Sequence, residues 1–195
     1  MSRDVIQIIS AKRTDLEIQL ALQCAPVLTG IKISNLFSTE AGNRAQVIEL
    51  LDFAGISYHM MYEQDHTVIF LLYRQKELNK YLRKRQVKKF LRKMGYSQID
   101  LEQFLDDIAI AYTSYMIMKE GFPHELGVVL GYPVSDVEGF IQHQGRNYQY
   151  SGYWKVYKNV DAAKQIFLQF EEAREQLIRM VAAGWGMADI LTIYN

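Results

Sequence analysis

The chain lacks the features that define several protein classes. Its 195 residues include one cysteine, Cys24, and three prolines. A single cysteine excludes an internal disulfide, and without a Cys-x-x-Cys pair one chain cannot hold a zinc ribbon or an iron–sulfur cluster. No apolar run approaches the roughly 20 residues of a membrane-spanning helix, and the N-terminus shows no cleavable signal pattern. We therefore expect a cytoplasmic protein without a membrane segment.

Net charge is also lacking, because 22 Lys and Arg balance 22 Asp and Glu. The balance gives no general preference for nucleic acid or membranes. The charge is nevertheless uneven: residues 74–93 contain ten basic residues and one acidic residue, a local charge of +9. Such a run is usually a solvated surface, here facing acidic residues of the next helix. The alternative is a nucleic-acid or polyanion surface, for which the candidate residues are Arg83, Lys84, Lys88 and Lys89.

The length and a hydrophobic content of 49% predict one domain spanning residues 1–195. Apolar spacing, glycines and prolines indicate helices that alternate with a few strands. The pattern predicts an α+β (mixed α/β) fold, in which a small sheet is flanked by several helices. The expected helices are 16–25 (ended by Pro26), 43–54, 75–94, 100–118 and 161–183, and the expected strands are 30–37, a hairpin over 56–74, and 152–157.

The stretch "FPHELGVVLGYPVSDVEGF" (122–140) concentrates two of the three prolines and three of the twelve glycines, and a fourth glycine, Gly121, comes directly before it. It predicts a helix, a tight turn and a second helix capped by Ser135 or Asp136, a helix-turn-helix-like segment near 123–144. The spacing resembles that of DNA-reading helix-turn-helix units. The second helix, however, carries Asp136 and Glu138 and no Lys or Arg, so its charge would repel phosphate. We interpret the spacing as packing.

Three side chains supply the chemistry of an activated thiol: Cys24, His124 and Glu125. The expected position of Cys24 at a helix C-terminus argues against activation, because the helix dipole there raises a thiol pKa. The pair His124–Glu125 is not a zinc-protease motif, since Val128 stands where the second histidine is needed. Cys24 and His124 are also potential axial ligands of a haem iron. The sequence leaves the cofactor and any metal open.

Aromatic residues gather in "NYQYSGYWKVY" (147–157). On a strand, Tyr153, Lys155 and Tyr157 would share one face and Trp154 the other. One face would pack inward, and the other would present rings and a cation to a flat or anionic ligand. Core packing of all these rings is the competing interpretation.

The 122–140 stretch followed by "GYWKVY" resembles the signature of an uncharacterised bacterial family, domain-of-unknown-function family 3793. "CAPVLTGIKISNLFS" (24–38), "VIFLLYR" and "FLRKMGY" resemble its other blocks, so the similarity spans nearly the whole chain. The resemblance implies no activity, only positions of interest. These are Cys24, Pro26, Gly30, Lys32, Asn35, Pro123, His124, Glu125, Gly127, Gly131, Tyr132, Pro133, Asp136, Gly139, Phe140, Trp154, Lys155 and Tyr157.

Three functional hypotheses follow. The first is a domain that binds a small ligand or a protein partner in a pocket formed by 122–140, 152–157 and 24–35. The second is nucleic-acid binding through the basic helix 74–93 and the helix-turn-helix-like segment. The third is a thiol-dependent enzyme using Cys24 and His124. The candidate ligand-binding residues of the first hypothesis are Cys24, Lys32, Asn35, His124, Glu125, Tyr153, Trp154, Lys155 and Tyr157.

Overall fold

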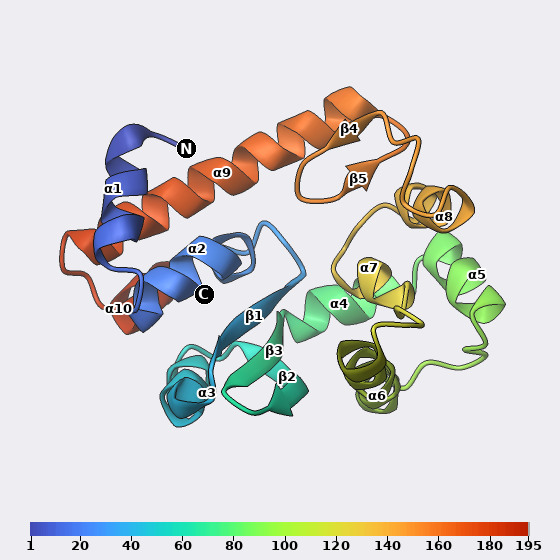
Figure 1. Cartoon of the computed structure of the whole chain (residues 1–195), viewed down its shortest axis with the longest axis horizontal. Coiled ribbons are helices and arrows are strands. Elements are labelled where there is room, and N and C mark those ends of the chain that lie inside the picture. Colours follow the sequence, from blue (N-terminus) through green and yellow to red (C-terminus); the bar gives the residue numbers. More distant parts are fainter. Residues whose placement is uncertain (195) are drawn as a thin grey trace. The chain divides into compact units, whose positions relative to one another are not determined.

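The computed structural model describes residues 1–194 and confirms the α+β fold class (Figure 1). The chain divides into two compact units, which are described separately below. The first comprises residues 1–74 and, within the described chain, 168–194, and the second comprises Gln75–Phe167. The prediction of one domain over 1–195 stays a prediction.

The elements are α1 (Arg3–Ala11), α2 (Leu16–Leu28), β1 (Ser34–Glu40), the 3-10 helix η1 (Ala41–Asn43), α3 (Arg44–Phe53), β2 (Ser57–Gln64), β3 (Thr67–Tyr73), α4 (Gln75–Leu82), α5 (Arg85–Lys93), α6 (Leu101–Met118), α7 (Glu125–Val129), α8 (Val134–Gln142), β4 (Tyr150–Ser151), β5 (Lys155–Val156), α9 (Val160–Ala182) and α10 (Met187–Tyr194).

The first unit is built on an antiparallel sheet with the strand order β1-β3-β2. The expected hairpin is confirmed: β2 and β3 meet at a turn in which Asp65 has a φ of 55°. The central strand β3 is buried from Val68 to Leu72, as a strand paired on both edges requires. Helix α2 packs on β1 and β3, and α3 packs beside β2.

Helix α2 does not end at Pro26 as expected but continues to Leu28. The proline lacks an N–H and disfavours helical geometry at Ala25. Val27 and Leu28 are fully buried in the core of the first unit, and Thr29 N–H donates to the Ala25 carbonyl at 2.9 Å. Burial of these two large apolar side chains, worth about 1.5–3 kcal/mol each, therefore offsets the free-energy cost of placing Pro26 inside the helix.

In the second unit the expected helix 75–94 is two helices, because α4 ends at Leu82 and α5 begins at Arg85. The buried side chains explain the break. At 100° per residue, one continuous helix would place Val87, Phe90 and Leu91 about half a turn around the axis from Leu78 and Leu82. All five are buried. The extended Lys84 (ψ 138°) between the helices allows both apolar groups to face inward.

The expected helix-turn-helix-like segment is present as α7 and α8. Asp136 does not cap α8, since its carboxylate is turned inward and only 3% exposed. Its Oδ2 accepts from Trp154 Nε1 at 2.9 Å, and its Oδ1 accepts from the backbone N–H groups of Tyr157 (2.9 Å) and Lys158 (3.1 Å). One carboxylate thus fixes the 150–158 hairpin to α8.

The expected strand over 152–157 is shorter: only Lys155–Val156 pairs, with Tyr150–Ser151. Close packing accounts for two glycines of this region. A Cβ on Gly152 would lie 2.3 Å from the Phe167 ring, and one on Gly139 would lie 2.5 Å from Cγ of Tyr157. The glycines therefore let rings approach the backbone closely.

Within residues 1–194, no helix has the length and apolar content needed to cross a bilayer. The longest, α9, has 23 residues and carries charges along its length.

Gly139→Ala tests the packing of α8 on the hairpin. The new methyl group would overlap the buried Tyr157 ring, and this overlap outweighs the roughly 1 kcal/mol gained in helix propensity. We expect a net loss of about 1–2 kcal/mol in the free energy of unfolding, measured by urea denaturation. Gly42→Ala is the control, because no atom lies within 4 Å of its Cβ position. Equal stability of the two variants would contradict this account.

Candidate functional site

Three predicted site residues, Cys24, Lys32 and Asn35, meet in the first unit. The Asn35 side chain links them: its Oδ1 accepts from Lys32 Nζ at 2.5 Å, and its Nδ2 lies 3.8 Å from Cys24 Sγ. Asn35 Nδ2 also donates to the Gln23 carbonyl at 2.6 Å. Lys32 Nζ lies 5.9 Å from the centre of the Phe170 ring. The cluster ties α2 to β1, and the prediction that these residues bind a ligand stays a prediction.

Burial governs the chemistry of this cluster. It raises the pKa of the Cys24 thiol to about 12, partly countered by Asn35 and Lys32. It lowers the pKa of the Lys32 ammonium from 10.5 to about 8. The thiol is therefore protonated at neutral pH, the opposite of an activated nucleophile. The hypothesis of a thiol-dependent enzyme gains no support from this geometry.

The other predicted residues lie in the second unit. His124 is half-buried, with its ring centre 5.7 Å from those of Phe122 and Phe140, and burial lowers its pKa. Glu125 begins α7 and is 8% exposed. Because 24–35 belongs to the first unit and 122–157 to the second, the pocket predicted from all three segments stays a prediction.

The four aromatic and cationic residues of the hairpin have packing roles. Trp154 stacks on Tyr132 with ring centres 5.2 Å apart, and Tyr157 stacks on His143 at 5.6 Å. Lys155 Nζ donates to the Gly145 carbonyl at 2.8 Å and lies over the Phe140 ring. The remaining residue, Tyr153, lies 5.5 Å from Phe167, ring centre to ring centre.

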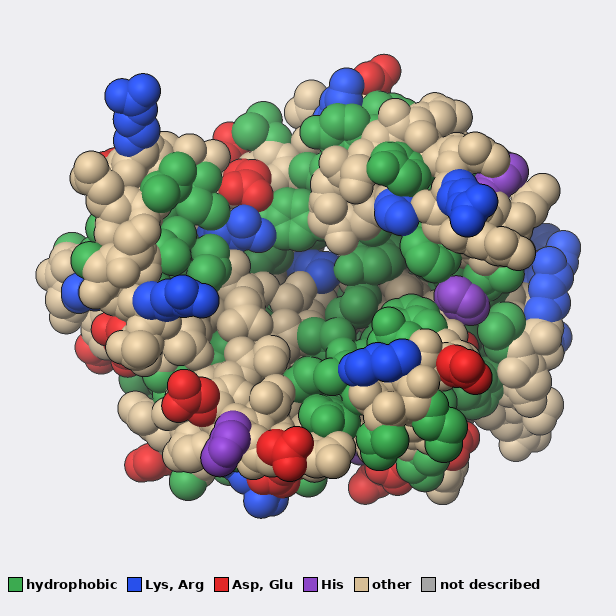
Figure 2. Space-filling view, in the orientation of Figure 1, with side chains coloured by type: hydrophobic (Ala, Val, Ile, Leu, Met, Phe, Trp, Pro, Cys, Tyr) green, Lys and Arg blue, Asp and Glu red, His purple; other side chains and the backbone are tan. Residues whose placement is uncertain are grey.

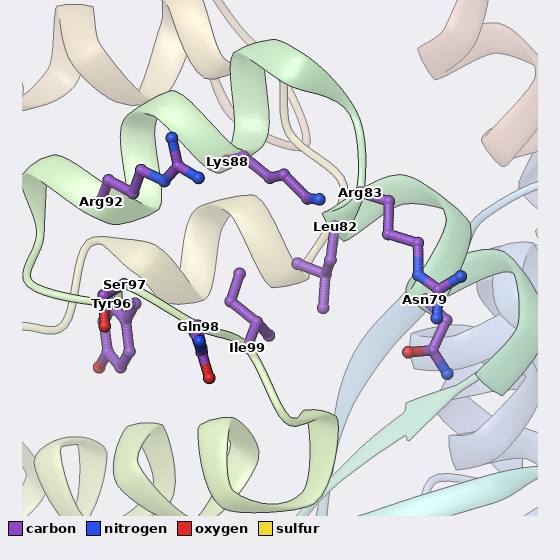
Figure 3. A pocket seen from close by; sticks show the side chains of 9 residues that line it. All are labelled: Asn79, Leu82, Arg83, Lys88, Arg92, Tyr96, Ser97, Gln98 and Ile99. Atoms are coloured by element: carbon purple, nitrogen blue, oxygen red, sulfur yellow. The ribbon is translucent and has the colours of Figure 1, made fainter.

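A pocket of about 310 Å³ lies elsewhere in the second unit, between α4, α5 and the loop that follows α5 (Figure 3). Three cations line it: Arg83 from the turn after α4, and Lys88 and Arg92 from α5. Figure 3 shows Leu82 and Ile99 pointing toward the space between these elements. We call this the basic pocket. Its lining residues are Asn79, Leu82, Arg83, Lys88, Arg92, Tyr96, Ser97, Gln98 and Ile99.

The cations of the basic pocket are not neutralised by the protein. Among residues 1–194, Arg83, Lys88 and Arg92 form no ion pair with a carboxylate, and all three are exposed. The ion pair formed by α5 joins Lys93 to Glu138 of α8 at 3.2 Å. The acidic residues of α6 that were expected to neutralise this surface do not pair with the pocket cations. Three cations without a carboxylate partner in the described part of the chain therefore line one pocket.

Positive charge continues from the pocket along α5. Arg85 and Lys89 line an adjacent, more open hollow together with the three pocket cations. Figure 2 shows blue Lys and Arg side chains gathered at the edge of the view where Figure 1 draws α5. The fourth predicted polyanion residue, Lys84, lies between the helices with its Nζ 5.1 Å from the centre of the Tyr81 ring.

The wall of the pocket is tied to the 122–140 segment by two tyrosine hydroxyls. Tyr96 donates to Glu125 Oε1 at 3.0 Å, and Tyr81 donates to the Tyr132 carbonyl at 3.0 Å. Burial raises the pKa of both tyrosines, and the Glu125 carboxylate contributes at Tyr96. The glycine- and proline-rich segment therefore supports α4 and the loop after α5, which line the pocket.

Two of the four residues predicted from the sequence for polyanion binding, Arg83 and Lys88, line the basic pocket; the prediction did not include Arg92 or the loop Tyr96–Ile99. A signal was present, because the buried positions change phase between Leu82 and Val87. That change predicts two short helices joined by a turn, and a turn between two basic helices creates a concave surface. No three His, Cys, Asp or Glu side chains within the described residues gather as a candidate metal site.

The fold and the site together define an α+β protein with an exposed, cation-lined pocket. The sequence profile of a family described as a protein of unknown function (DUF3793) matches residues 20–191, and the chain belongs to that family. This confirms the resemblance seen in the sequence. No curated protein and no solved structure matches the chain.

The lowered pKa of Lys32 makes stability depend on pH. Between pH 8 and 10.5 the unfolded chain holds this proton and the folded protein does not, so the contribution of Lys32 to the free energy of unfolding rises with pH across that window. The raised pKa of the Cys24 thiol acts in the opposite direction above pH 9. In urea titrations at several pH values, the unfolding free energy of the wild type relative to that of Lys32→Met should therefore rise by up to about 3 kcal/mol, because both proteins keep the thiol. Parallel pH profiles for the two proteins would show that Lys32 titrates normally.

Proposed function

We propose that this protein is a binding protein whose second unit takes an anionic ligand in the basic pocket. The observation that carries the proposal is that Arg83, Lys88 and Arg92 line one pocket and have no carboxylate partner within residues 1–194. A cytoplasmic setting suits the proposal, because the single cysteine is buried and needs no oxidising compartment.

The lining of the pocket matches a small polar anion. Two guanidinium groups and one ammonium group supply charge-assisted donors, which suit phosphate or carboxylate oxygens. Asn79, Ser97 and Gln98 add uncharged groups that can bond to the rest of a ligand. The volume of about 310 Å³ lies at the lower end of the range for small-molecule sites.

The pocket cations, which have no carboxylate partner within residues 1–194, favour the same conclusion. They are exposed, so water screens their mutual repulsion, and the positive charge of each is available to a ligand. An anion bound in the pocket would gain their combined attraction. Affinity for such a ligand should fall as salt rises, since the pocket is open to solvent.

A second candidate function is binding of a nucleic-acid backbone. It is favoured by the continuation of positive charge beyond the pocket, to Lys84, Arg85 and Lys89. Successive phosphates would lie along α5 rather than in one pocket. The α8 helix is not the reading element in this proposal, because Asp136 is buried against the hairpin and Glu138 is paired with Lys93.

Inorganic tripolyphosphate is a suitable probe of the small-anion proposal. Isothermal titration calorimetry at low salt should detect its binding to the wild type. Arg83→Gln, Lys88→Gln and Arg92→Gln should each weaken binding by about 1–2 kcal/mol, because each removes a charge-assisted contact. Lys80→Gln is the control, since it removes the same charge from α4 outside the pocket lining. No binding by the wild type, or an equal loss of affinity in the control, would refute the proposal that the basic pocket binds an anion.

Single-stranded RNA of about 20 nucleotides separates the two candidates by fluorescence anisotropy. Backbone binding predicts a log–log salt slope of about −0.7 for each phosphate contacted. The double variant Lys84→Gln, Lys89→Gln should then weaken RNA binding and leave tripolyphosphate affinity within about twofold, because neither residue lines the basic pocket. RNA binding that is absent at low salt would leave only the small-anion proposal.

A further inference from the structure

The loop that forms one wall of the basic pocket is fixed at both ends by helix caps. Gly95 has a φ of 104°, and the N–H groups of Gly95 and Tyr96 donate to the carbonyls of Arg92 (3.1 Å) and Leu91 (3.0 Å), which closes α5. Asp100 begins the next helix by accepting from Gln103 N–H at 3.1 Å. Between these caps, the Tyr96 side chain provides a further anchor.

Tyr96 is held by two contacts on the side of the loop away from α5. Its ring meets that of Phe104 edge to face at 4.8 Å, and its hydroxyl donates to Glu125 Oε1 at 3.0 Å. The Glu125 side chain is more than nine-tenths buried. A buried carboxylate is costly unless it accepts hydrogen bonds, so the tyrosine hydroxyl is a strongly held partner.

We infer that Glu125 is a positioning residue of the basic pocket and acts through Tyr96. The inference rests on the proposed anion-binding function. Glu125 does not line the pocket, and its negative charge would oppose an anion there. Its role is to draw the Tyr96 hydroxyl away from the pocket, which sets the path of the loop carrying Ser97 and Gln98 opposite the three cations.

The same geometry gives the His124–Glu125 pair a part in the site without a catalytic role. Glu125 is the first residue of α7, where the positive end of the helix dipole favours a carboxylate. Pro123 and His124 begin the turn that presents it: the Pro123 carbonyl accepts from Leu126 N–H at 3.1 Å. The segment singled out by its unusual composition is thereby connected to the loop of the pocket through the hydrogen bond between Tyr96 and Glu125.

A double-mutant cycle on tripolyphosphate binding tests this inference. Tyr96→Phe and Glu125→Ala should each weaken binding three- to tenfold, and the double variant should be no weaker than the worse single variant, because both remove the same hydrogen bond. Glu125→Gln should recover most of the affinity, since its side-chain oxygen still accepts from the tyrosine hydroxyl. Should Glu125→Ala fail to fold, Tyr96→Phe, which loses only a hydroxyl, still decides the question.

Asp136→Asn is the matched control for general destabilisation. It weakens a buried carboxylate contact in the same segment, at the hairpin and not at the pocket wall. We expect a lowered melting temperature and an unchanged tripolyphosphate dissociation constant at a temperature where the variant is folded. Folded Tyr96→Phe and Glu125→Ala proteins that bind like the wild type would overturn the inference while leaving the anion pocket standing. A wild type that does not bind would instead remove the proposed function and the inference with it.

Discussion

The basic pocket depends on one packing constraint in the segment 75–94. Leu78 and Leu82 must be buried, and so must Val87, Phe90 and Leu91. No single helix satisfies both groups, because they would lie on opposite sides of its axis. The chain resolves the conflict by an extended residue at Lys84, and the turn brings Arg83 to the same pocket as Lys88 and Arg92. The break between α4 and α5 therefore accounts both for the concave shape of the basic pocket and for the grouping of the three cations that line it.

The 122–140 segment supports this arrangement through contacts that each require a particular residue type. Gly139 is needed because the Tyr157 ring lies against α8, and Asp136 is needed because three N–H groups converge on its carboxylate. Glu125 and the carbonyl of Tyr132 accept the hydroxyls of Tyr96 and Tyr81. The unusual composition of 122–140 thus reflects the close packing of this segment. Through Glu125 and Tyr132 the segment also supports the elements that line the ligand site we propose.

The sequence predicted the fold where periodicity was continuous and local. The helices 43–54 and 100–118 and the hairpin over 56–74 needed only spacing, caps and turn residues, and all are present. The strand 152–157 and the end of α2 at Pro26 were wrong, because tertiary contacts overrode local preference. Burial of Val27 and Leu28 extended the helix, and the Asp136 bonds held the hairpin with little regular pairing.

The candidate site was less predictable than the fold for a related reason. Cys24, Lys32 and Asn35 are near one another in sequence, so their cluster follows from a helix and an adjacent strand. The basic pocket instead combines cations from two helices with a loop whose anchor, Glu125, is 29 residues away from Tyr96. No local pattern encodes that hydrogen bond. The sequence did contain two signals: the high density of cations in 74–93, and the change in the helical phase of the apolar positions between Leu82 and Val87.

The cost of that cation density is the strongest argument that the surface has a function. Helix α5 and its N-cap place four like-charged pairs one turn apart, Lys84–Lys88, Arg85–Lys89, Lys88–Arg92 and Lys89–Lys93. Such pairs destabilise a helix by about 0.2–0.5 kcal/mol each, or about 1–2 kcal/mol together. The chain has 22 acidic residues, yet within residues 1–194 the carboxylate that pairs with α5 is Glu138 alone. Solvation of the surface would be served equally well by alternating charges, which would stabilise the helix. The anionic ligand that we propose would offset this repulsion on binding.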